Sequence, residues 1–570
     1  MKLTFIVILY LLLFLLSAVT VESGSNYTVP SSKVSELIRL HFLSSSSSAE
    51  DSLNGSPIHS AEMLRHFYKT RDFQSAWSAN AQSFEQARIL LNLIEGVQSH
   101  GLIPEYYHID KIKSLIKDSR DAFDTSGLTA QQFAELDILF TDAFLTLGCH
   151  FSGGCLAPLI AEAEWHANQD AININAVLET ALSENTIQKS LYQLLPLQEG
   201  YEKLRKGLQR YRTIHASGGW PKIRNSTILM RGDRTEQIVN LRDRLIASGD
   251  MKYNNKENAT VFDQEIKNAV IRFQERNGLN PDGIVGPLTI EALNIPVETR
   301  IRQIELNLER MRWTSRDTGH RYIMVNIAGF KLDVIENGNK TMSMDVIVGK
   351  PYWHTPVLSE TMTYIVLNPS WIIPESIAAE EILPKIRENP DYLTMRNIKV
   401  MTNWSQDATE INSRMVKWFE IDEDNFHYKL IQQPGTSNPL GNIKFIFPNK
   451  YNVYLHDTPG KGLFSRNIRS FSHGCIRIEK PLELAEYLLK ENPGWTRNKI
   501  LSVINKGKAQ TVYLPKPIRI HLLYLTAWVD EEDMIQFRND IYRRDERLYM
   551  ALLNRPARLT NASKLTFTLH

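Results

Sequence analysis

The chain has 570 residues, of which 43% are hydrophobic, which is enough to build three to four folded domains with ordinary cores. Its 65 lysines and arginines balance 64 aspartates and glutamates, so the formal net charge is only +1. This balance excludes a protein held to nucleic acid by its overall charge, and no basic run or zinc-finger spacing suggests nucleic acid as a partner.

The N-terminal residues are expected to form an export signal. Lys2 precedes an apolar run over residues 3–21, and a polar stretch follows. A basic start, an apolar core and a polar end are the layout of a signal peptide. The run also nearly reaches the ~20 residues that span a bilayer, and no A-x-A cleavage site follows it. Residues 1–24 are therefore expected to be a cleaved signal peptide or a retained membrane anchor, and both place the rest outside the cytoplasm.

Two segments of different composition follow the signal. Residues 25–58 contain SSSSS and EDSLNGSP, a composition too polar to bury a core, and are expected to form a polar linker. Residues 59–217 repeat apolar residues at spacings of three and four, which predicts a helical scaffold domain. Cys149 and Cys155 lie in this block, and the sequence leaves open whether they form a disulfide or remain free thiols.

A small helical module is expected over residues 230–296. The stretch FDQEIKNAVIRF places Phe262, Ile266 and Phe273 on one helical face, and Asp263 is a suitable N-cap residue. A Pro-Asp-Gly turn follows, and Pro287 can occupy the first position of the next helix. The pattern predicts two or three short helices around a small core.

The hydrophobic period changes to two from about residue 300. Alternating apolar residues flank Asn337-Gly338, which predicts two strands joined by a type I′ turn. Residues 300–506 are expected to form a mainly-β catalytic domain, interrupted at about 374–432 by a helical, polar insertion that could act as a lid. Residues 507–570 are expected to be a C-terminal extension. The predicted fold class is thus a multidomain α+β protein.

The chemistry concentrates in the stretch from Val453 to Pro481. Cys475 ends Ser472-His473-Gly474-Cys475, and His456 ends a strand-like segment upstream. A histidine that accepts the thiol proton would give an imidazolium–thiolate pair and hence a nucleophile. Gly474 lets the backbone approach a substrate, and the amides of residues 474 and 475 could form an oxyanion hole.

The residues alone leave other interpretations open. An isolated cysteine is most often a small buried hydrophobic residue, and His473 alone would by default have a structural hydrogen bond. A zinc site formed by His456, His473 and Cys475 would lack an evident fourth ligand, and His-x-Cys is unusual spacing.

A family resemblance distinguishes among these interpretations. LHDTPGKGLFSRNIRSFSHGCIR resembles the signature of L,D-transpeptidases with a YkuD-type catalytic domain. FYKTRDFQSAW resembles the scaffold domain of the large branch of that family, and DGIVGPLTIEALN is similar to its peptidoglycan-binding domain. In one departure, many members have Asn two residues after the cysteine, where this chain has Arg477, so the role of that position in substrate binding is open.

The resemblance implies a peptidoglycan cross-linking enzyme that needs no cofactor and no metal. Cys475 would attack the third residue of a tetrapeptide stem and release D-Ala, and a diaminopimelate amine of a second stem would resolve the thioester in a 3→3 link. His456 would be the base, and His473 and Gly474 would line the oxyanion site. Expected substrate contacts are Tyr454, Arg477, Ser472 and Trp371.

The resemblance also implies the partners of the protein, its cellular location and the alternative activities to consider. Stem peptides are the expected partners, wall-synthesis enzymes are candidates, and the membrane is reached only through the N-terminal segment of a periplasmic or cell-envelope protein. An L,D-carboxypeptidase or a lipoprotein-anchoring exchange would use the same thioester. A non-catalytic peptidoglycan-binding scaffold would be expected to lack the nucleophile or its base, and both are present here.

Overall fold

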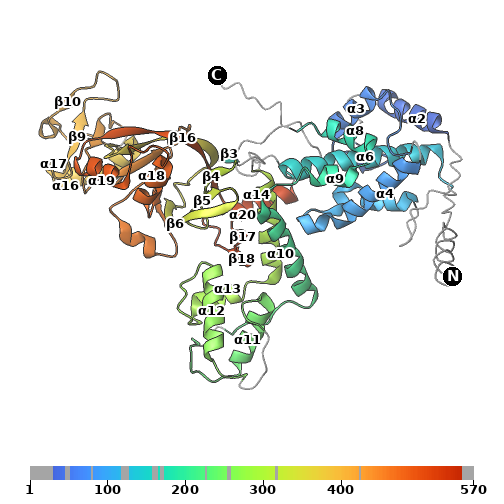
Figure 1. The fold of residues 1–570 in the computed structure, drawn as a ribbon, viewed down its shortest axis with the longest axis horizontal. Helices are drawn as coiled ribbons and strands as arrows, with labels where there is room; N and C mark the ends of the chain where they lie inside the picture. Colours follow the sequence, from blue (N-terminus) through green and yellow to red (C-terminus); the bar gives the residue numbers. More distant parts are fainter. Residues whose placement is uncertain are drawn as a thin grey trace, which may run out of the picture.

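The computed structural model describes residues 30–44, 52–78, 81–116, 127–156, 165–166, 172–224, 228–252, 259–314, 319–422 and 425–554. Figure 1 shows an elongated molecule, with a helical block at one end, a β-rich body towards the other and a small helical unit projecting between them. The expected signal or anchor over 1–24 lies outside the described residues. Within the described part of the chain, no helix is both long and apolar enough to cross a membrane.

The N-terminal helices pack around α6, which is buried along most of its length (Figure 1). A capping box begins α6: the Thr129 side chain accepts the Gln132 amide hydrogen, while the Gln132 side chain accepts from the Thr129 amide. The predicted helical scaffold is confirmed. Its helices are α2 (Ser31–Ser44), α3 (Ala61–Thr70), α4 (Ala81–Gly96), α5 (Ile109–Ile116), α6 (Ala130–Gly153), α8 (Ile174–Ser183) and α9 (Ile187–Tyr192).

The polar linker expected over 25–58 is wrong in its central part. Residues 31–44 form helix α2, whose Val34 and Ile38 are buried in the scaffold core. The prediction failed because the serine run near the end of the helix dominates the average composition of the segment. The short amphipathic stretch before that run was therefore not recognised. A short hairpin, β1 (Ser52–Leu53) and β2 (Ser56–Pro57), completes the described part of this segment.

The small helical module has the predicted local structure. Asp263 accepts the Ile266 amide hydrogen as the N-cap of α12, Pro287 begins α13, and Phe262, Ile266 and Phe273 are buried in the core of the module. Its helices are α11 (Gln237–Ser248), α12 (Gln264–Arg276) and α13 (Pro287–Leu293).

Two long helices join the three parts. Helix α10 (Glu199–Ala216) packs against α14 (Val297–Arg312), and buried residues of both belong to the same hydrophobic cluster as the β-rich body. The hairpin of β17 (Ala527–Val529) and β18 (Ile535–Phe537) and helix α20 (Arg544–Leu553) pack at the same junction (Figure 1). The scaffold and the β-rich body therefore share a continuous packed connection.

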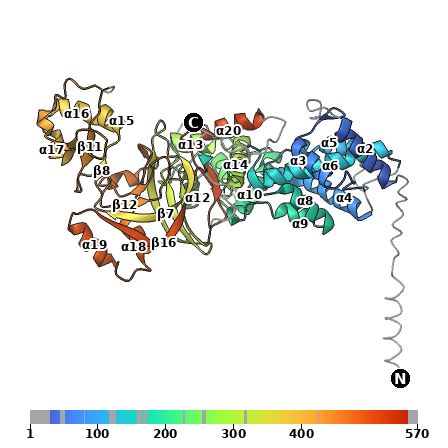
Figure 2. The ribbon, with the colours of Figure 1, turned by 90° about the horizontal axis from the view of Figure 1, so that it is seen from above.

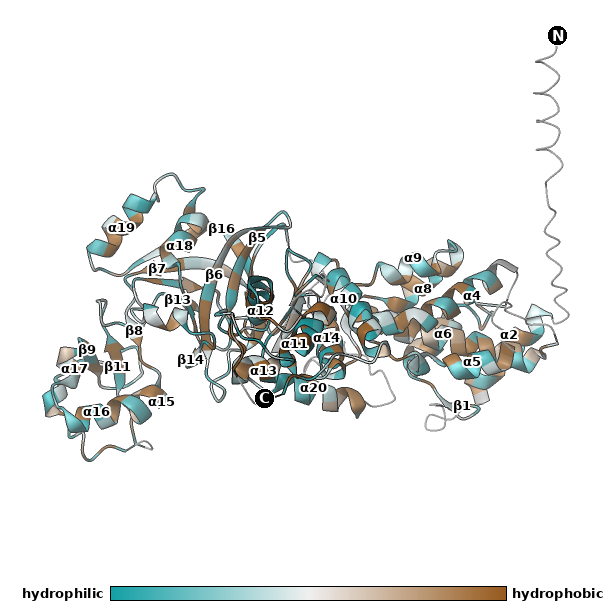
Figure 3. Ribbon diagram, turned by 90° about the horizontal axis from the view of Figure 1, so that it is seen from below, coloured by the Kyte–Doolittle hydropathy of each residue, from teal (hydrophilic) through white to brown (hydrophobic). Residues whose placement is uncertain are grey.

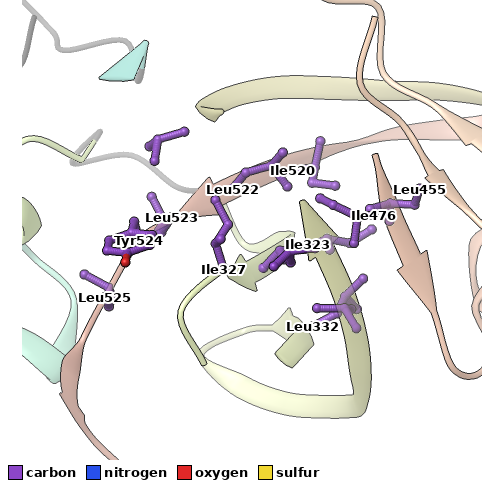
Figure 4. Packing of buried hydrophobic residues seen from close by; sticks show 14 of the residues in the cluster. Ile323, Ile327, Leu332, Leu455, Ile476, Ile520, Leu522, Leu523, Tyr524 and Leu525 are labelled. Atoms are coloured by element: carbon purple, nitrogen blue, oxygen red, sulfur yellow. The ribbon is translucent and has the colours of Figure 1, made fainter. Parts of the chain in front are cut away.

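Strands of the β-rich body close into a ring in the order β12-β13-β15-β6-β5-β4-β16-β7, with β7 pairing back onto β12. Asn337 and Gly338 both have positive φ between β5 and β6, as the predicted type I′ turn requires. Figure 4 shows apolar side chains from several strands meeting inside this ring. The strands are β4 (Arg321–Asn326), β5 (Lys331–Glu336), β6 (Asn339–Gly349), β7 (Val357–Leu367), β12 (Ile443–Ile446), β13 (Leu455–His456), β15 (Ile476–Ile478) and β16 (Gln510–Leu523), with β3 (Trp165–His166) beside β7 and β14 (Ser470–Ser472) beside β6.

The domain boundary expected at residue 506 cuts through this sheet. Strand β16 lies between β4 and β7, with Ile520 and Leu522 fully buried, so the segment expected to be a C-terminal extension supplies a central strand. Its two partners precede it by more than 100 residues, and a pairing at that sequence separation leaves no local signal. Helices α18 (Pro481–Leu489) and α19 (Arg497–Asn505) lead into it.

The insertion, residues 371–432, departs from β7 and returns to β12. It has the expected short helices but also a four-stranded sheet, ordered β10-β9-β11-β8, and its own apolar core around Ile373, Leu383 and Leu430. It is therefore a small mixed unit rather than a helical segment. Its elements are β8 (Trp371–Ile372), α15 (Glu375–Ile377), the π-helical turn η3 (Ala378–Ile382), α16 (Leu383–Glu388), α17 (Tyr392–Met395), β9 (Ile398–Met401), β10 (Glu410–Ile411) and β11 (Lys429–Gln432).

Candidate active site

Cys475 and His456 come from neighbouring strands. Strand β13 runs parallel to β15, with Leu455 opposite Ile476 and His456 opposite Arg477. Because successive side chains alternate between faces, Leu455 and Ile476 point into the core (Figure 4), whereas His456 and Cys475 share the other face. Two residues along one strand and one strand spacing across correspond to about 8 Å between their Cα atoms, a separation that side chains can bridge.

The imidazole of His456 is held in one tautomer. Its Nδ1 lies 2.5 Å from the backbone carbonyl oxygen of Asp457. A carbonyl can only accept, so Nδ1 carries the proton and Nε2 is left with a lone pair. The Asp457 carboxylate is itself held by the amides of Thr458 and Asn442 and by the Lys461 ammonium, which fixes the residue that orients the ring.

His456 is neutral at ordinary pH. Burial, followed by the charge of Arg477, lowers its pKa from 6.5 to about 3, and the hydrogen bond to Asp457 opposes this shift. The side chain is 4% exposed. A buried neutral imidazole with a free Nε2 is a proton acceptor that requires no prior deprotonation.

The Cys475 thiol is partly buried, and its Sγ lies 3.9 Å from the Asn452 carbonyl oxygen. Burial raises its pKa, while hydrogen bonds from the backbone and side chain of Tyr454 and the charges of Lys444 and Arg477 lower it. The net effect is a pKa above the ordinary thiol value, so the resting thiol is protonated.

The imidazolium–thiolate pair expected from the sequence is therefore wrong for the resting state. Burial disfavours the charged forms of both groups, and Arg477 and Lys444 add repulsion that further disfavours an imidazolium. The same two cations favour a thiolate once the proton leaves. The site thus holds a neutral thiol and a neutral base, with positive charges placed where negative charge develops on sulfur.

The loop before Cys475 is held by its own hydrogen bonds. The Ser472 hydroxyl donates to the Cys475 carbonyl at 2.5 Å and accepts the Gly474 amide hydrogen at 3.1 Å, and Thr355 donates to the Gly474 carbonyl at 2.8 Å. Gly474 has φ +108°, a conformation that favours glycine. Ser472 is only 2% exposed and its recorded partners lie within the loop, so its expected contact with substrate stays a prediction.

The same hydrogen bonds reduce the number of amide donors available to the expected oxyanion hole. The Gly474 amide is occupied by Ser472, so it is a poor donor to a substrate oxygen. Within the described part of the chain, no hydrogen bond is recorded for the Cys475 amide. That amide remains a candidate donor, and Gly474 contributes shape to the turn.

His473 contacts the insertion rather than Cys475. Its Nε2 lies 2.6 Å from the Glu381 carboxylate of η3, and its ring lies 3.7 Å from that of Trp353 between centroids. Burial lowers the pKa of His473, and Glu381 opposes that effect. His473 therefore links the loop before Cys475 to the insertion.

Tyr454 and Arg477 lie on the face of the sheet that bears Cys475, as their spacing predicts. Tyr454 hydrogen-bonds the Cys475 thiol, and its ring is covered by Lys444, whose Nζ is 3.6 Å from the ring centroid. The Arg477 Nε is buried without a hydrogen-bond partner in the described part of the chain. Both positions remain candidates for substrate contact.

Trp371 is not brought to Cys475 by any recorded contact. It begins β8, pairs with Gln432 and packs against the core of the insertion. Its expected role as a wall of the site stays a prediction.

Sequence reasoning missed four residues near Cys475 and the loop before it: Trp353, Thr355, Glu381 and Lys444. Glu381 and Trp353 are far from Cys475 in sequence, and no local signal marks them. The position of Lys444 could have been predicted from the sequence. Alternation in NIKFIFP places its side chain on the other face of the strand from the buried Ile443 and Phe445.

The other two cysteines belong to the core of the helical scaffold. Cys149 and Cys155 are not joined in a disulfide; the Cys149 Sγ lies 3.9 Å from the Met63 sulfur, and burial raises the pKa of Cys149 to about 12. Over the residues that the structure describes, no group of three His, Cys, Asp or Glu side chains converges as a metal site would require.

Comparison with protein families matches three parts of the chain. Residues 320–504 match the YkuD family, described as "L,D-transpeptidase catalytic domain". Residues 62–208 match a family described as "Scaffold domain", and residues 234–293 match one described as "Putative peptidoglycan binding domain".

A curated protein of Haemophilus influenzae, named "Putative L,D-transpeptidase", is 34% identical over 258 residues. The match covers 45% of this chain and 51% of that protein, so it spans about half the length of the relative. Among solved structures, an L,D-transpeptidase from Mycobacterium smegmatis is 13% identical with a TM-score of 0.17, covering 36% of this chain and 58% of that one. An L,D-transpeptidase from Xylanimonas cellulosilytica is 14% identical with a TM-score of 0.15, covering 52% and 98%.

Proposed function

Because this chain carries an L,D-transpeptidase catalytic domain of the YkuD family together with a scaffold and a peptidoglycan-binding domain, we propose that it forms 3→3 cross-links between peptidoglycan stems in the cell envelope. The observation that carries the proposal is the Nδ1–H of His456 bonded to Asp457, which leaves Nε2 as a base on the face that bears Cys475.

Acylation proceeds by attack of Cys475 on the carbonyl of the third stem residue. The thiol proton passes to His456 Nε2 as the sulfur–carbon bond forms, and the Cys475 amide donates to the developing oxyanion. When the tetrahedral intermediate collapses, the carbon–nitrogen bond to D-Ala breaks and the departing nitrogen takes the proton from Nε2. The product is a thioester, and His456 is again neutral.

Deacylation repeats these steps with a different nucleophile. The side-chain amine of diaminopimelate on a second stem loses a proton to His456 Nε2 and attacks the thioester carbonyl. The carbon–sulfur bond breaks, and the sulfur recovers the proton from Nε2. Lys444 and Arg477 stabilise the departing thiolate, since both lower the pKa of Cys475.

A contact of the insertion supports a role in covering the bound stem. Glu381 of the insertion lies against His473, two residues before Cys475, so the insertion reaches the loop that carries the thiol. We assign it the role of a lid that excludes water from the thioester, which would favour an amine acceptor over hydrolysis.

Incubation with disaccharide-tetrapeptide, followed by mass analysis, tests the proposal. The expected product is a dimer that has lost one D-Ala. It should be absent with Cys475→Ala and reduced about 100-fold or more with His456→Ala. A trimmed monomer without dimer would replace the proposal with an L,D-carboxypeptidase, whereas binding of peptidoglycan without turnover would indicate a non-catalytic scaffold.

A further inference from the structure

A row of side chains crosses the sheet from Cys475. Leu455 faces Ile476, Phe445 faces Leu455, Ile446 faces Tyr364, and Tyr364 faces Tyr513. The register of the first two pairs also sets their neighbours. The residues before Ile476 and Leu455, Cys475 and Tyr454, lie side by side, and Tyr454 lies beside Ile446, the residue after Phe445. The residues of this tyrosine row, from β15 to β16, are Cys475, Tyr454, Ile446, Tyr364 and Tyr513.

The tyrosine row lies on the face of the sheet that the C-terminal helices leave uncovered. Residues of the opposite parity, such as Phe445 and Val512, are buried in the same cluster as Leu484 of α18 and Ile500 of α19. Figure 3 shows α18 and α19 on one side of β7 and the insertion on the other. The row therefore faces the side on which the insertion lies.

An aromatic pair ends the row. Tyr364 and Tyr513 have ring centroids 5.5 Å apart, and Tyr513 is 73% exposed, more than any other tyrosine that the structure describes. Exposed tyrosine rings offer flat apolar faces with a polar hydroxyl edge, which suits the alternating C–H and hydroxyl faces of a sugar ring.

We propose that Tyr364 and Tyr513 form a saccharide subsite that binds the sugar bearing the donor stem peptide. This inference rests on the proposed function, because the stem peptide that acylates Cys475 would place its sugar at the other end of the tyrosine row, at Tyr364 and Tyr513.

Lengths support this assignment. From Cys475, directly before β15, to Tyr364 on β7 there are three strand spacings, or about 14 Å. Three extended residues between the acyl carbon and the sugar span about 10 Å. The γ-linked residue and the lactyl ether of the natural stem add further bonds, so a sugar joined to a stem acylated on Cys475 reaches the tyrosine pair.

Charge along the path fits the same occupant. Lys444 lies two residues before Ile446 on the same strand and over Tyr454, and Arg477 follows Cys475 by two residues. Peptidoglycan stems carry free carboxylates between the sugar and the acyl donor. The two cations therefore lie where an extended stem would present its negative charges.

Two donors that differ only in the sugar test the subsite. Wild-type protein should be acylated with a higher kcat/KM by disaccharide-tetrapeptide than by free tetrapeptide. Tyr513→Ala should reduce the ratio of the two values roughly two- to tenfold. Tyr513→Phe, which keeps the ring, and Tyr192→Ala, at another exposed tyrosine far away in the scaffold, should leave the ratio unchanged. An unchanged ratio in Tyr513→Ala would overturn the subsite.

A binding measurement separates failure of the subsite from failure of the proposed function. Calorimetry of the Cys475→Ala protein with disaccharide-tetrapeptide needs no turnover. The Tyr513→Ala change in that background should weaken binding by the same roughly two- to tenfold factor. Equal affinity with and without Tyr513 overturns the saccharide subsite even if cross-linking occurs. Weakened binding with no turnover by wild-type protein supports the subsite and refutes the transpeptidase.

Discussion

At the scale of single residues, the site is organised by burial more than by charge pairing. His456 and Cys475 are both neutral because the interior disfavours their ionised forms, and the cations Lys444 and Arg477 are placed to stabilise sulfur rather than imidazole. Reactivity then depends on proton transfer during attack. The hydrogen-bond partners of each group thus matter more than the resting charge.

Tyr454→Phe tests the hydrogen bond to the thiol. The hydroxyl lowers the pKa of Cys475, so removing it should raise that pKa and shift alkylation of Cys475 by iodoacetamide to higher pH. At neutral pH the rate should fall about fivefold, the equivalent of a hydrogen bond of about 1 kcal/mol. Tyr451→Phe, three residues earlier, is the control. An alkylation profile that does not move would remove Tyr454 from the site.

Gly474→Ala tests the turn that presents Cys475. A φ of +108° and a distance of 3.4 Å from the added Cβ to the His354 carbonyl oxygen should cost about 1–2 kcal/mol of stability. The shifted turn should also slow acylation. Gly507→Ala, at φ +67° with open space around it, should lower the melting temperature similarly without slowing acylation. Equal acylation rates in the two variants would show that the turn does not position the thiol.

At the scale of elements, the sequence predicted the helix caps and the hairpin turn, which depend on contacts between residues close in the chain. Asp263, Pro287 and the Asn337-Gly338 turn were predictable because caps and turns depend on residues a few positions apart. The strand register that places His456 and Cys475 on one face had no local signal, because a loop separates β13 from β15 in sequence. The sheet within the insertion was missed, because its strands are short and pair across helices.

Glu381→Gln tests the contact between the insertion and His473, in the loop before Cys475. The carboxylate–imidazole contact is partly exposed, so its loss should be worth less than about 1 kcal/mol. Amide hydrogen exchange of residues 375–388 should accelerate about two- to fivefold. Glu380→Gln changes a neighbouring exposed carboxylate and should have no such effect. Equal exchange in both variants would mean that other contacts hold the insertion in place.

At the scale of the whole molecule, the parts are joined by buried polar contacts that sequence patterns do not reveal. Arg312 of α14 donates to the His100 carbonyl and the Tyr201 hydroxyl and pairs with Glu309, while Glu309 accepts the amide hydrogens of Cys155 and Leu156. Strand β16 likewise completes a sheet begun far earlier. Both features arise from pairings between distant segments.

Arg312→Met tests this junction. Both partners of the Arg312–Glu309 pair are almost fully buried, so the change should leave an uncompensated carboxylate and cost about 3–5 kcal/mol. The expected readout is a lower melting temperature of the transition that includes the scaffold. Adding Glu309→Gln should restore part of that loss. A double variant no more stable than Arg312→Met would contradict the role of the ion pair.

The pH dependence of acylation tests the neutral thiol–imidazole site most directly. The rate constant for acylation of Cys475 by a carbapenem can be followed by intact mass from pH 4 to pH 8. His456 is deprotonated above about pH 3 and the thiol remains protonated over this range, so the rate should stay level. A rate that falls about tenfold between pH 7 and pH 5, with a midpoint near the ordinary histidine pKa of about 6.5, would contradict the account.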